Sequence, residues 1–169
     1  MNISLLNLSG QDIDDNPIVL ESYVRDSDAS YFAENNDDKV FYCCEPDKDD
    51  EVNNSKHEPD PRCDYLLVGR TDNSVRYIEL KGTDKSSGSQ KCCVSTWAHA
   101  FHQLFISYAA YSICYEDNDK FELILCTSIP EDARKGRATN YTKYKYYKSI
   151  LNQFGYPPKV LYRGDVDIV

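Results

Sequence analysis

Apolar residues gather in short runs along the chain, and these runs predict five strands. The runs lie at residues 40–44, 64–69, 75–81, 121–127 and 159–162 and are rich in β-branched, aromatic and aliphatic side chains. Residues 70–74 between the second and third runs tolerate tight turns, so a hairpin is expected there. A turn centred between Asp72 and Asn73 would place Asp64 opposite Lys81 and Leu66 opposite Glu79.

Apolar residues spaced three or four apart predict helices in the second half of the chain. Residues 96–115 show this spacing at Trp97, Phe101, Leu104, Tyr108 and Tyr111, which is typical of a helix that packs on a core. Residues 141–154 predict another helix. Both should cover the sheet that the strands form.

A first helix is expected near the N-terminus. Asn16 and Pro17 have the residue types of a helix N-cap and first helical position, and Ile18 and Val19 would begin its apolar side. The sequence leaves open whether this helix ends near Asp26, with a second short turn over residues 29–34, or runs through.

The order of these elements predicts one α/β domain over residues 1–169, with a mixed central sheet flanked by helices. No internal repeat or domain linker interrupts the chain. Residues 45–62 contain three Pro and many acidic side chains, which is typical of a solvated loop insertion. The expected unit is therefore a single domain with one acidic loop.

Charge is distributed unevenly along the sequence. The formal net charge is −9, which by itself argues against a nucleic-acid partner. Residues 1–60, however, hold sixteen acidic and four basic side chains, and residues 61–169 hold twelve and fifteen. The acidity is a property of the N-terminal third, so the rest of the chain remains compatible with binding nucleic acid.

The sequence predicts a cytoplasmic protein without a membrane partner. Its longest apolar stretch, at residues 101–115, is shorter than the roughly 20 residues that span a bilayer, and the N-terminus lacks the features of a signal peptide. Seven Cys, including two adjacent pairs, do not have the spacing of zinc knuckles or of a disulfide framework. Buried thiols are favoured over structural zinc.

Charged side chains interrupt one of the predicted strands. Glu79 and Lys81 are two residues apart and should share a face, and the expected hairpin brings Asp64 beside them on the diagonal. Two carboxylates at this separation can bind a hard divalent cation such as Mg²⁺ or Mn²⁺. A salt-bridged patch on a solvated face is the structural alternative for the same three residues.

The surrounding order resembles the PD-(D/E)xK nuclease superfamily. The similarity covers about residues 40–127, with Asp64 at the start of one strand, Glu79 and Lys81 in the next, and Gln103 in the helix that follows. Cys63 stands in place of the name-giving Pro, while a literal Pro59-Asp60 pair lies in the preceding loop. Asp64 fits the motif better because it begins a strand.

The resemblance implies a restriction-endonuclease-like αβββαβ core and a metal-dependent nuclease, with DNA as the expected substrate. Asp64 and Glu79 would bind Mg²⁺ or Mn²⁺, and Asp64, Glu79, Lys81 and Gln103 would form the catalytic set. The adjacent carboxylates favour a charged Lys81 that positions water and stabilises charge over a general base. The first-helix acid would be Glu21 or Glu34, and the residues do not decide between them.

A basic, aromatic segment follows the last long strand. Residues 134–148 interleave Lys and Arg with Tyr, a pattern that suits contacts with phosphates and unpaired bases, and a solvated helix whose Tyr rings pack on the sheet is the plainer interpretation. The nucleic-acid-binding residues predicted here are Arg134, Lys135, Arg137 and Lys143. The resemblance also implies a homodimer, and the alternative to a nuclease is a catalytically inactive module of the same fold that binds nucleic acid or a protein.

Overall fold

The computed structural model describes two sheets and two helices of the 169-residue chain. It describes residues 8–21, 29–46, 62–82, 93–114, 120–128, 138–153, 155 and 157–169, with the backbone alone at 93–96, 138–144 and 147. Within these ranges no helix is long and apolar enough to cross a membrane. The elements are β1 (Gly10–Ile13), β2 (Ile18–Glu21), β3 (Ser30–Glu34), β4 (Phe41–Cys44), β5 (Tyr65–Gly69), β6 (Ser74–Lys81), α2 (Cys93–Tyr111), η3 (Ser112–Cys114), β7 (Lys120–Thr127), α3 (Ala138–Gln153), β8 (Lys159–Tyr162) and β9 (Asp167–Ile168).

The larger sheet is mixed and has the strand order β1-β4-β5-β6-β7-β8. Strands β1, β4, β5 and β6 pair antiparallel, whereas β7 and β8 continue the sheet in parallel with β6. Parallel neighbours need a crossover connection, and α2 lies in the connection from β6 to β7. The prediction of a mixed α/β domain is confirmed at this level.

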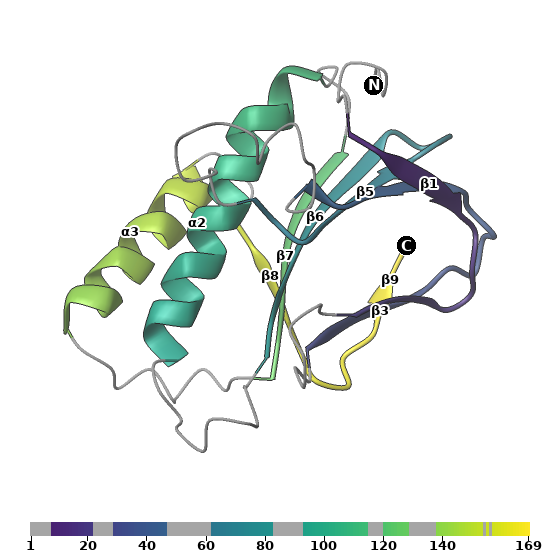
Figure 1. Cartoon of the computed structure of the whole chain (residues 1–169). Helices are drawn as coiled ribbons and strands as arrows, with labels where there is room; N and C mark the ends of the chain where they lie inside the picture. Colours follow the sequence, from purple (N-terminus) through teal and green to yellow (C-terminus); the bar gives the residue numbers. More distant parts are fainter. Residues whose placement is uncertain are drawn as a thin grey trace.

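Two cores cover the two faces of the larger sheet. Helices α2 and α3 lie side by side on one face, and β3 and β9 of the three-stranded sheet lie on the other (Figure 1). On the helix face, Trp97, Phe101 and Leu104 of α2 pack with Leu66 and Tyr77 of the sheet. The predicted apolar stripe of α2 is therefore buried as expected.

The opposite face follows from the alternation of strand side chains. Tyr65, Leu67, Ile78 and Leu80 point away from the helices and pack against Tyr31 of the small sheet. A strand that is buried on both faces has a continuous apolar sequence. Strand β5 is an example, because all five of its residues are buried. The sheet is therefore the middle layer of the domain.

The β5–β6 hairpin forms as predicted, but its register differs by two residues. Tyr65 pairs with Ile78 and Val68 with Val75, so the predicted pairing of Leu66 with Glu79 is wrong. The reason lies in the turn, where Asp72 Oδ1 accepts hydrogen bonds from the backbone N–H of Ser74 at 3.1 Å and from its hydroxyl at 2.6 Å. A shift of two residues keeps every side chain on its predicted face.

Glycine is required where this turn closes. A Cβ added to Gly69 would lie 2.0 Å from Asp72 Oδ1 and 2.6 Å from Ser74 Oγ. The same turn places Asn73 at φ 52°, in the left-handed region that Asn tolerates. The Asp72 side chain therefore ends the hairpin loop at Ser74, and this sets the register of the whole hairpin.

The prediction of a helix after Pro17 is wrong. Residues 18–21 form strand β2, which pairs antiparallel with β3, and β3 pairs in parallel with β9 at the C-terminus. The suggested short turn over residues 29–34 is also wrong, because β3 occupies this segment. This small sheet forms by pairing between strands from the two ends of the chain. Local sequence patterns do not indicate such long-range pairing.

Candidate active site

Strand β6 carries two charged residues at its end, on the face that α2 covers. Glu79 lies on the same face of the strand as Val75 and Tyr77, which belong to the helix-facing core. Its carboxylate forms an ion pair with Lys81, whose side chain is 19% exposed, while that of Glu79 is 0% exposed. A fully buried carboxylate is rare in proteins unless a charged partner accompanies it.

Asp64 lies in a bend directly before β5. The observed register, extended by one residue, places it opposite Glu79, and the Cβ atoms of directly opposed residues lie roughly 4.5–5.5 Å apart. Asp64 Oδ2 accepts a hydrogen bond from the backbone N–H of Leu80 at 2.7 Å. The structure thus brings Asp64, Glu79 and Lys81 together at one end of the hairpin, in a closer pairing than the predicted diagonal.

Helix α2 positions the segment that enters β5. Gln103 Nε2 donates a hydrogen bond to the Arg62 carbonyl at 2.8 Å, and one turn later Ser107 Oγ accepts one from the Cys63 N–H, also at 2.8 Å. A further turn along, the Arg62 guanidinium lies over the Tyr111 ring at 5.7 Å. Three successive turns of one helix face therefore fix the backbone immediately before Asp64.

Gln103 lies inside the protein, and its hydrogen bond to the Arg62 carbonyl puts it beside the segment that enters β5. It is 5% exposed, and its Oε1 is buried with no hydrogen-bond partner among the described residues. Ser107 was not predicted as part of this region. The signal that could have found it is its spacing of four residues from Gln103, which puts both on one helix face.

Cys63 reports the electrostatics of this region. Its side chain is completely buried, and burial together with the charges of Glu79 and Asp64 raises the pKa of the thiol. The Cys63 thiol therefore stays protonated at neutral pH and donates to the Tyr65 carbonyl at 3.3 Å. Both carboxylates therefore lie close enough to Cys63 to disfavour its thiolate.

The donor set at this end of the hairpin fits a hard divalent cation. Asp64 and Glu79 both offer carboxylate oxygens, which Mg²⁺ and Mn²⁺ prefer over sulfur. Across the described ranges, no group of three or more His, Cys, Asp or Glu is arranged to hold a metal. Mg²⁺ commonly binds through one or two carboxylates and keeps several waters, so two carboxylates suffice for this type of site.

The cysteines behave as the sequence predicts where they are described. Cys43, Cys44, Cys63, Cys114 and Cys126 are buried and are not in disulfide bonds. Burial raises the pKa of Cys43 to about 12, with the Glu45 charge as a second cause. Buried thiols of this kind are inert packing residues.

The predicted nucleic-acid-binding residues fall almost entirely outside the described part of the chain. Arg134, Lys135 and Arg137 lie there, as does most of the acidic loop at 45–62, and Lys143 is described only as backbone within α3. In the remainder of α3, Lys145 and Lys148 are exposed, and Tyr146 is 61% exposed. The basic rim stays a prediction.

The two alternatives for a first-helix acid both lie in strands. Glu21 ends β2 and Glu34 ends β3, and both side chains are exposed. Because these residues belong to the small sheet, the premise of an acid on a first helix is wrong for both.

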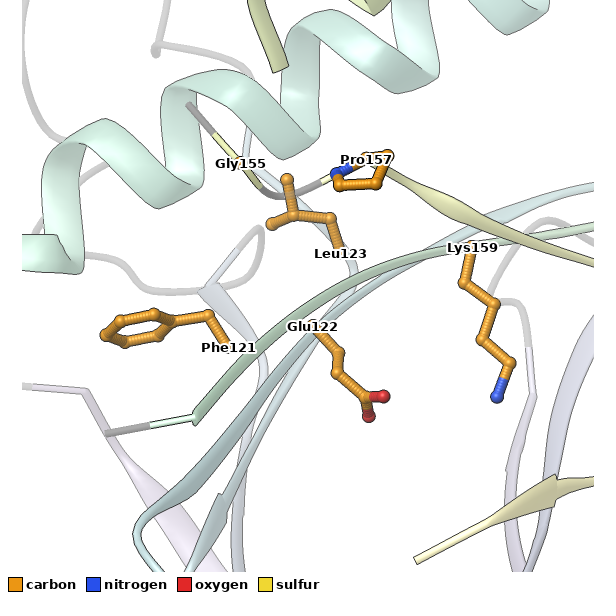
Figure 2. Close-up of a pocket in the computed structure, with 6 residues that line it drawn as sticks. All are labelled: Phe121, Glu122, Leu123, Gly155, Pro157 and Lys159. Carbon is orange, nitrogen blue, oxygen red and sulfur yellow. The ribbon is translucent and has the colours of Figure 1, made fainter. Parts of the chain in front are cut away.

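A second charged cluster, which the sequence did not predict, lies on the opposite face of the larger sheet. Asp167 of β9 accepts a hydrogen bond from the Tyr31 hydroxyl at 2.8 Å and pairs with Lys159. Arg76 pairs with Glu122 at 2.8 Å and lies 4.0 Å from Asp167. Figure 2 shows Glu122 and Lys159 on the other side of their strands from Leu123, beside a small pocket of about 190 Å³.

Comparisons of the chain with protein-family models, with curated proteins and with solved structures found no match.

Proposed function

We propose that the chain is a metal-dependent nuclease that hydrolyses phosphodiester bonds, with DNA as its substrate. The observation that carries the proposal is the Glu79 carboxylate, which is fully buried, paired with Lys81 and opposed by Asp64 at one end of the β5–β6 hairpin. Burial of an ionisable group costs free energy. Such groups therefore concentrate at sites where their chemistry is used.

The arrangement of elements supports this assignment. Strands β4, β5 and β6 form an antiparallel meander, and α2 connects β6 to the parallel strand β7. The finer assignment that we propose is the restriction-endonuclease-like core, in which an acid begins the middle strand of the meander and a Glu-x-Lys lies in the next. Asp64, Glu79 and Lys81 occupy these places.

Each residue has a distinct chemical task in this proposal. Asp64 and Glu79 would hold Mg²⁺, which neutralises charge on the phosphate and lowers the pKa of bound water. The Lys81 ammonium stabilises the negative charge that develops on the phosphate oxygens during attack. Gln103 Oε1 accepts a hydrogen bond from the attacking water and orients it towards phosphorus.

A catalytically inactive module of the same fold is the second candidate. The observation that favours it is the hydrogen bond from the Leu80 N–H to Asp64 Oδ2. This bond gives Asp64 a structural task, because its side chain takes the place of a backbone carbonyl at the end of the strand ladder. Such a module would bind nucleic acid or a protein without cleaving a substrate.

Digestion of defined substrates distinguishes the two candidates. The wild-type protein and the Lys81→Ala variant are assayed in parallel in Mg²⁺, in Mn²⁺ and in EDTA. The substrates are plasmid, linear duplex DNA, single-stranded DNA and RNA. Lys120→Ala is the matched control, because Lys120 is an exposed lysine at the far end of the adjacent strand. A nuclease requires metal-dependent cleavage that Lys81→Ala reduces by about 10²–10³-fold and that Lys120→Ala leaves unchanged.

Binding in the same assay separates the remaining outcomes. Retention of labelled DNA without cleavage of any substrate favours the inactive module. Cleavage that Lys81→Ala leaves intact, or that persists in EDTA, contradicts the assignment of these residues.

A further inference from the structure

The outer face of the small sheet is apolar where a solvent-facing sheet is ordinarily polar. Residues in β2 and β3 alternate between buried and exposed, with Ile18, Leu20, Tyr31 and Ala33 inside. A sheet with one face in solvent normally carries polar side chains there. The outward positions here include Val19 at 47%, Phe32 at 37% and Ile168 at 71% exposure.

These side chains form one patch because the register aligns them. Val19 of β2 pairs with Phe32 of β3. The parallel pairing of Ala33 with Asp167 puts Val166, which is 45% exposed, beside Phe32 on the other side. Val19, Phe32, Val166 and Ile168, here called the outer patch, thus extend across all three strands. Contiguous apolar patches of this kind commonly mark interaction sites.

The outer patch is acidic at its borders. Glu21 and Glu34 are outward-facing positions of the same strands, and the other outward position, Ser30, is uncharged. Among the described positions that face outward on β2, β3 and β9, none is Lys or Arg. A partner with apolar side chains flanked by basic ones complements this surface.

A pocket adjoins the outer patch and shares two residues with this face. It has a volume of about 460 Å³, and Val19 and Glu21 line it together with Leu20, Cys43 and Tyr65 of the interior. Asp15 and Glu45 add two further carboxylates, and no described residue in its lining is basic. A lining that combines apolar side chains with carboxylates suits the aliphatic stem and cationic head of an Arg or Lys side chain.

We propose that the outer patch and this pocket form a docking surface for a protein partner that presents apolar side chains together with a basic side chain that enters the pocket. A second copy of the chain does not fit, since a symmetric dimer would place this acidic face on an identical acidic face, and no described outward position of β2, β3 or β9 offers a cation to offset the repulsion. The surface lies on the opposite side of the larger sheet from Glu79, and the proposal is independent of nuclease activity.

Two labelled peptides of equal length test the proposal by fluorescence anisotropy. One is an amphipathic Arg/Leu peptide, and the other is its Glu/Leu counterpart. The wild-type chain should bind the Arg/Leu peptide alone, and Phe32→Ser should weaken binding by about tenfold. The double change Glu21→Gln with Glu34→Gln should weaken it by about threefold and flatten its salt dependence.

Ile113→Ser is the matched control, since Ile113 is 84% exposed in η3, outside the small sheet. It should bind like wild type, and thermal unfolding establishes that each variant is folded. Absence of Arg/Leu binding, equal binding of both peptides, or an unchanged Phe32→Ser variant would overturn the proposal. Sedimentation provides a further test, because a wild-type dimer that Phe32→Ser dissociates would show that a second copy covers the patch.

Discussion

The two faces of strand β6 bury charge in different ways. On the small-sheet face, Arg76 lies within a balanced cluster of two cations and two carboxylates that join β6, β7, β8 and β9. On the helix face, Glu79 and Lys81 lie at the strand end, where Lys81 retains access to solvent. The first arrangement connects elements distant in sequence. The second leaves a partly exposed ammonium beside a buried carboxylate.

Position in the strand thus separates a structural cluster from the cluster that we propose to be catalytic. A buried charge with partners on several strands stabilises their association, because loss of one partner leaves the others uncompensated. A charged pair at a strand end contributes less to the association of elements, yet it can meet a substrate. Equivalent carboxylate-to-amide changes on the two faces should therefore have different effects.

The largest effect is expected from Glu79→Gln on cleavage. Loss of the carboxylate removes one of two candidate metal ligands, so cleavage of DNA in Mg²⁺ should fall by about 10³-fold. The free energy of unfolding should change by about 1 kcal/mol or less, because the amide avoids the cost of burying a carboxylate and the partly exposed Lys81 can take up water. Initial cleavage rates and urea unfolding measure the two effects, and a large loss of stability with cleavage retained would reverse the comparison.

Asp167→Asn should have the opposite profile. Asp167 is 1% exposed and contacts Tyr31, Lys159 and Arg76, so removal of its charge should lower the unfolding free energy by about 3 kcal/mol. Cleavage by the folded fraction should remain at the wild-type level. Asp14→Asn, at an exposed position, is the matched control. A stability within about 0.5 kcal/mol of wild type would show that the cluster does not hold β9 in place.

Ser107→Ala should have an intermediate effect on stability. It leaves the buried N–H of Cys63 without its acceptor, which costs about 1–3 kcal/mol. Because Asp64 follows Cys63, metal-dependent cleavage should also fall by about tenfold. Ser107→Thr, which retains the hydroxyl, should recover most of both, and exposed Ser149→Ala should change neither. Equal losses of stability and cleavage in Ser107→Thr and Ser107→Ala would show that side-chain packing, and not the hydrogen bond, causes the effect.

Alkaline pH should produce the smallest change. Burial raises the pKa of the Cys63, Cys126 and Tyr31 side chains and brings that of Tyr111 to about 12. Unfolded thiols and phenols ionise at about 8.5 and 10, so unfolding releases protons above these values and stability falls as the pH rises. The unfolding free energy should decrease by about 0.3 kcal/mol for each buried thiol between pH 8 and 8.5, and more steeply at higher pH.

Urea unfolding under reducing conditions across this pH range measures the effect. Cys126→Ala removes one of the buried thiols and should reduce the slope of unfolding free energy against pH. A slope that stays at zero up to pH 9.5 would contradict protonated, buried thiols.

The sequence predicted β4 to β8 of the larger sheet because their signals are local, whereas β1 was not predicted. The apolar runs that became β5 and β7 and the apolar stripe of α2 each carry their own periodicity. The positions of Glu79, Lys81 and Gln103 followed from those elements. The hairpin register depended on one side chain, Asp72, whose hydrogen bonds to Ser74 move the turn by one residue from its expected centre.

The small sheet could not be predicted from local pattern. Its outward positions, such as Val19 and Phe32, are apolar, so the alternation that marks a half-buried strand is absent from the sequence. Its stability depends on β9, which lies more than a hundred residues away along the chain. The Arg76 cluster was missed for the same reason, because Asp167 joins it only through this distant pairing.

Titration of Mn²⁺ into the wild-type chain, Glu79→Gln and Asp167→Asn by isothermal calorimetry determines whether Glu79 binds a metal ion. Saturable binding is expected for wild type and for folded Asp167→Asn, and loss of that binding is expected for Glu79→Gln. Absence of binding to wild type, or equal binding to Glu79→Gln, would contradict the assignment of the helix face of β6 as a metal-dependent active site.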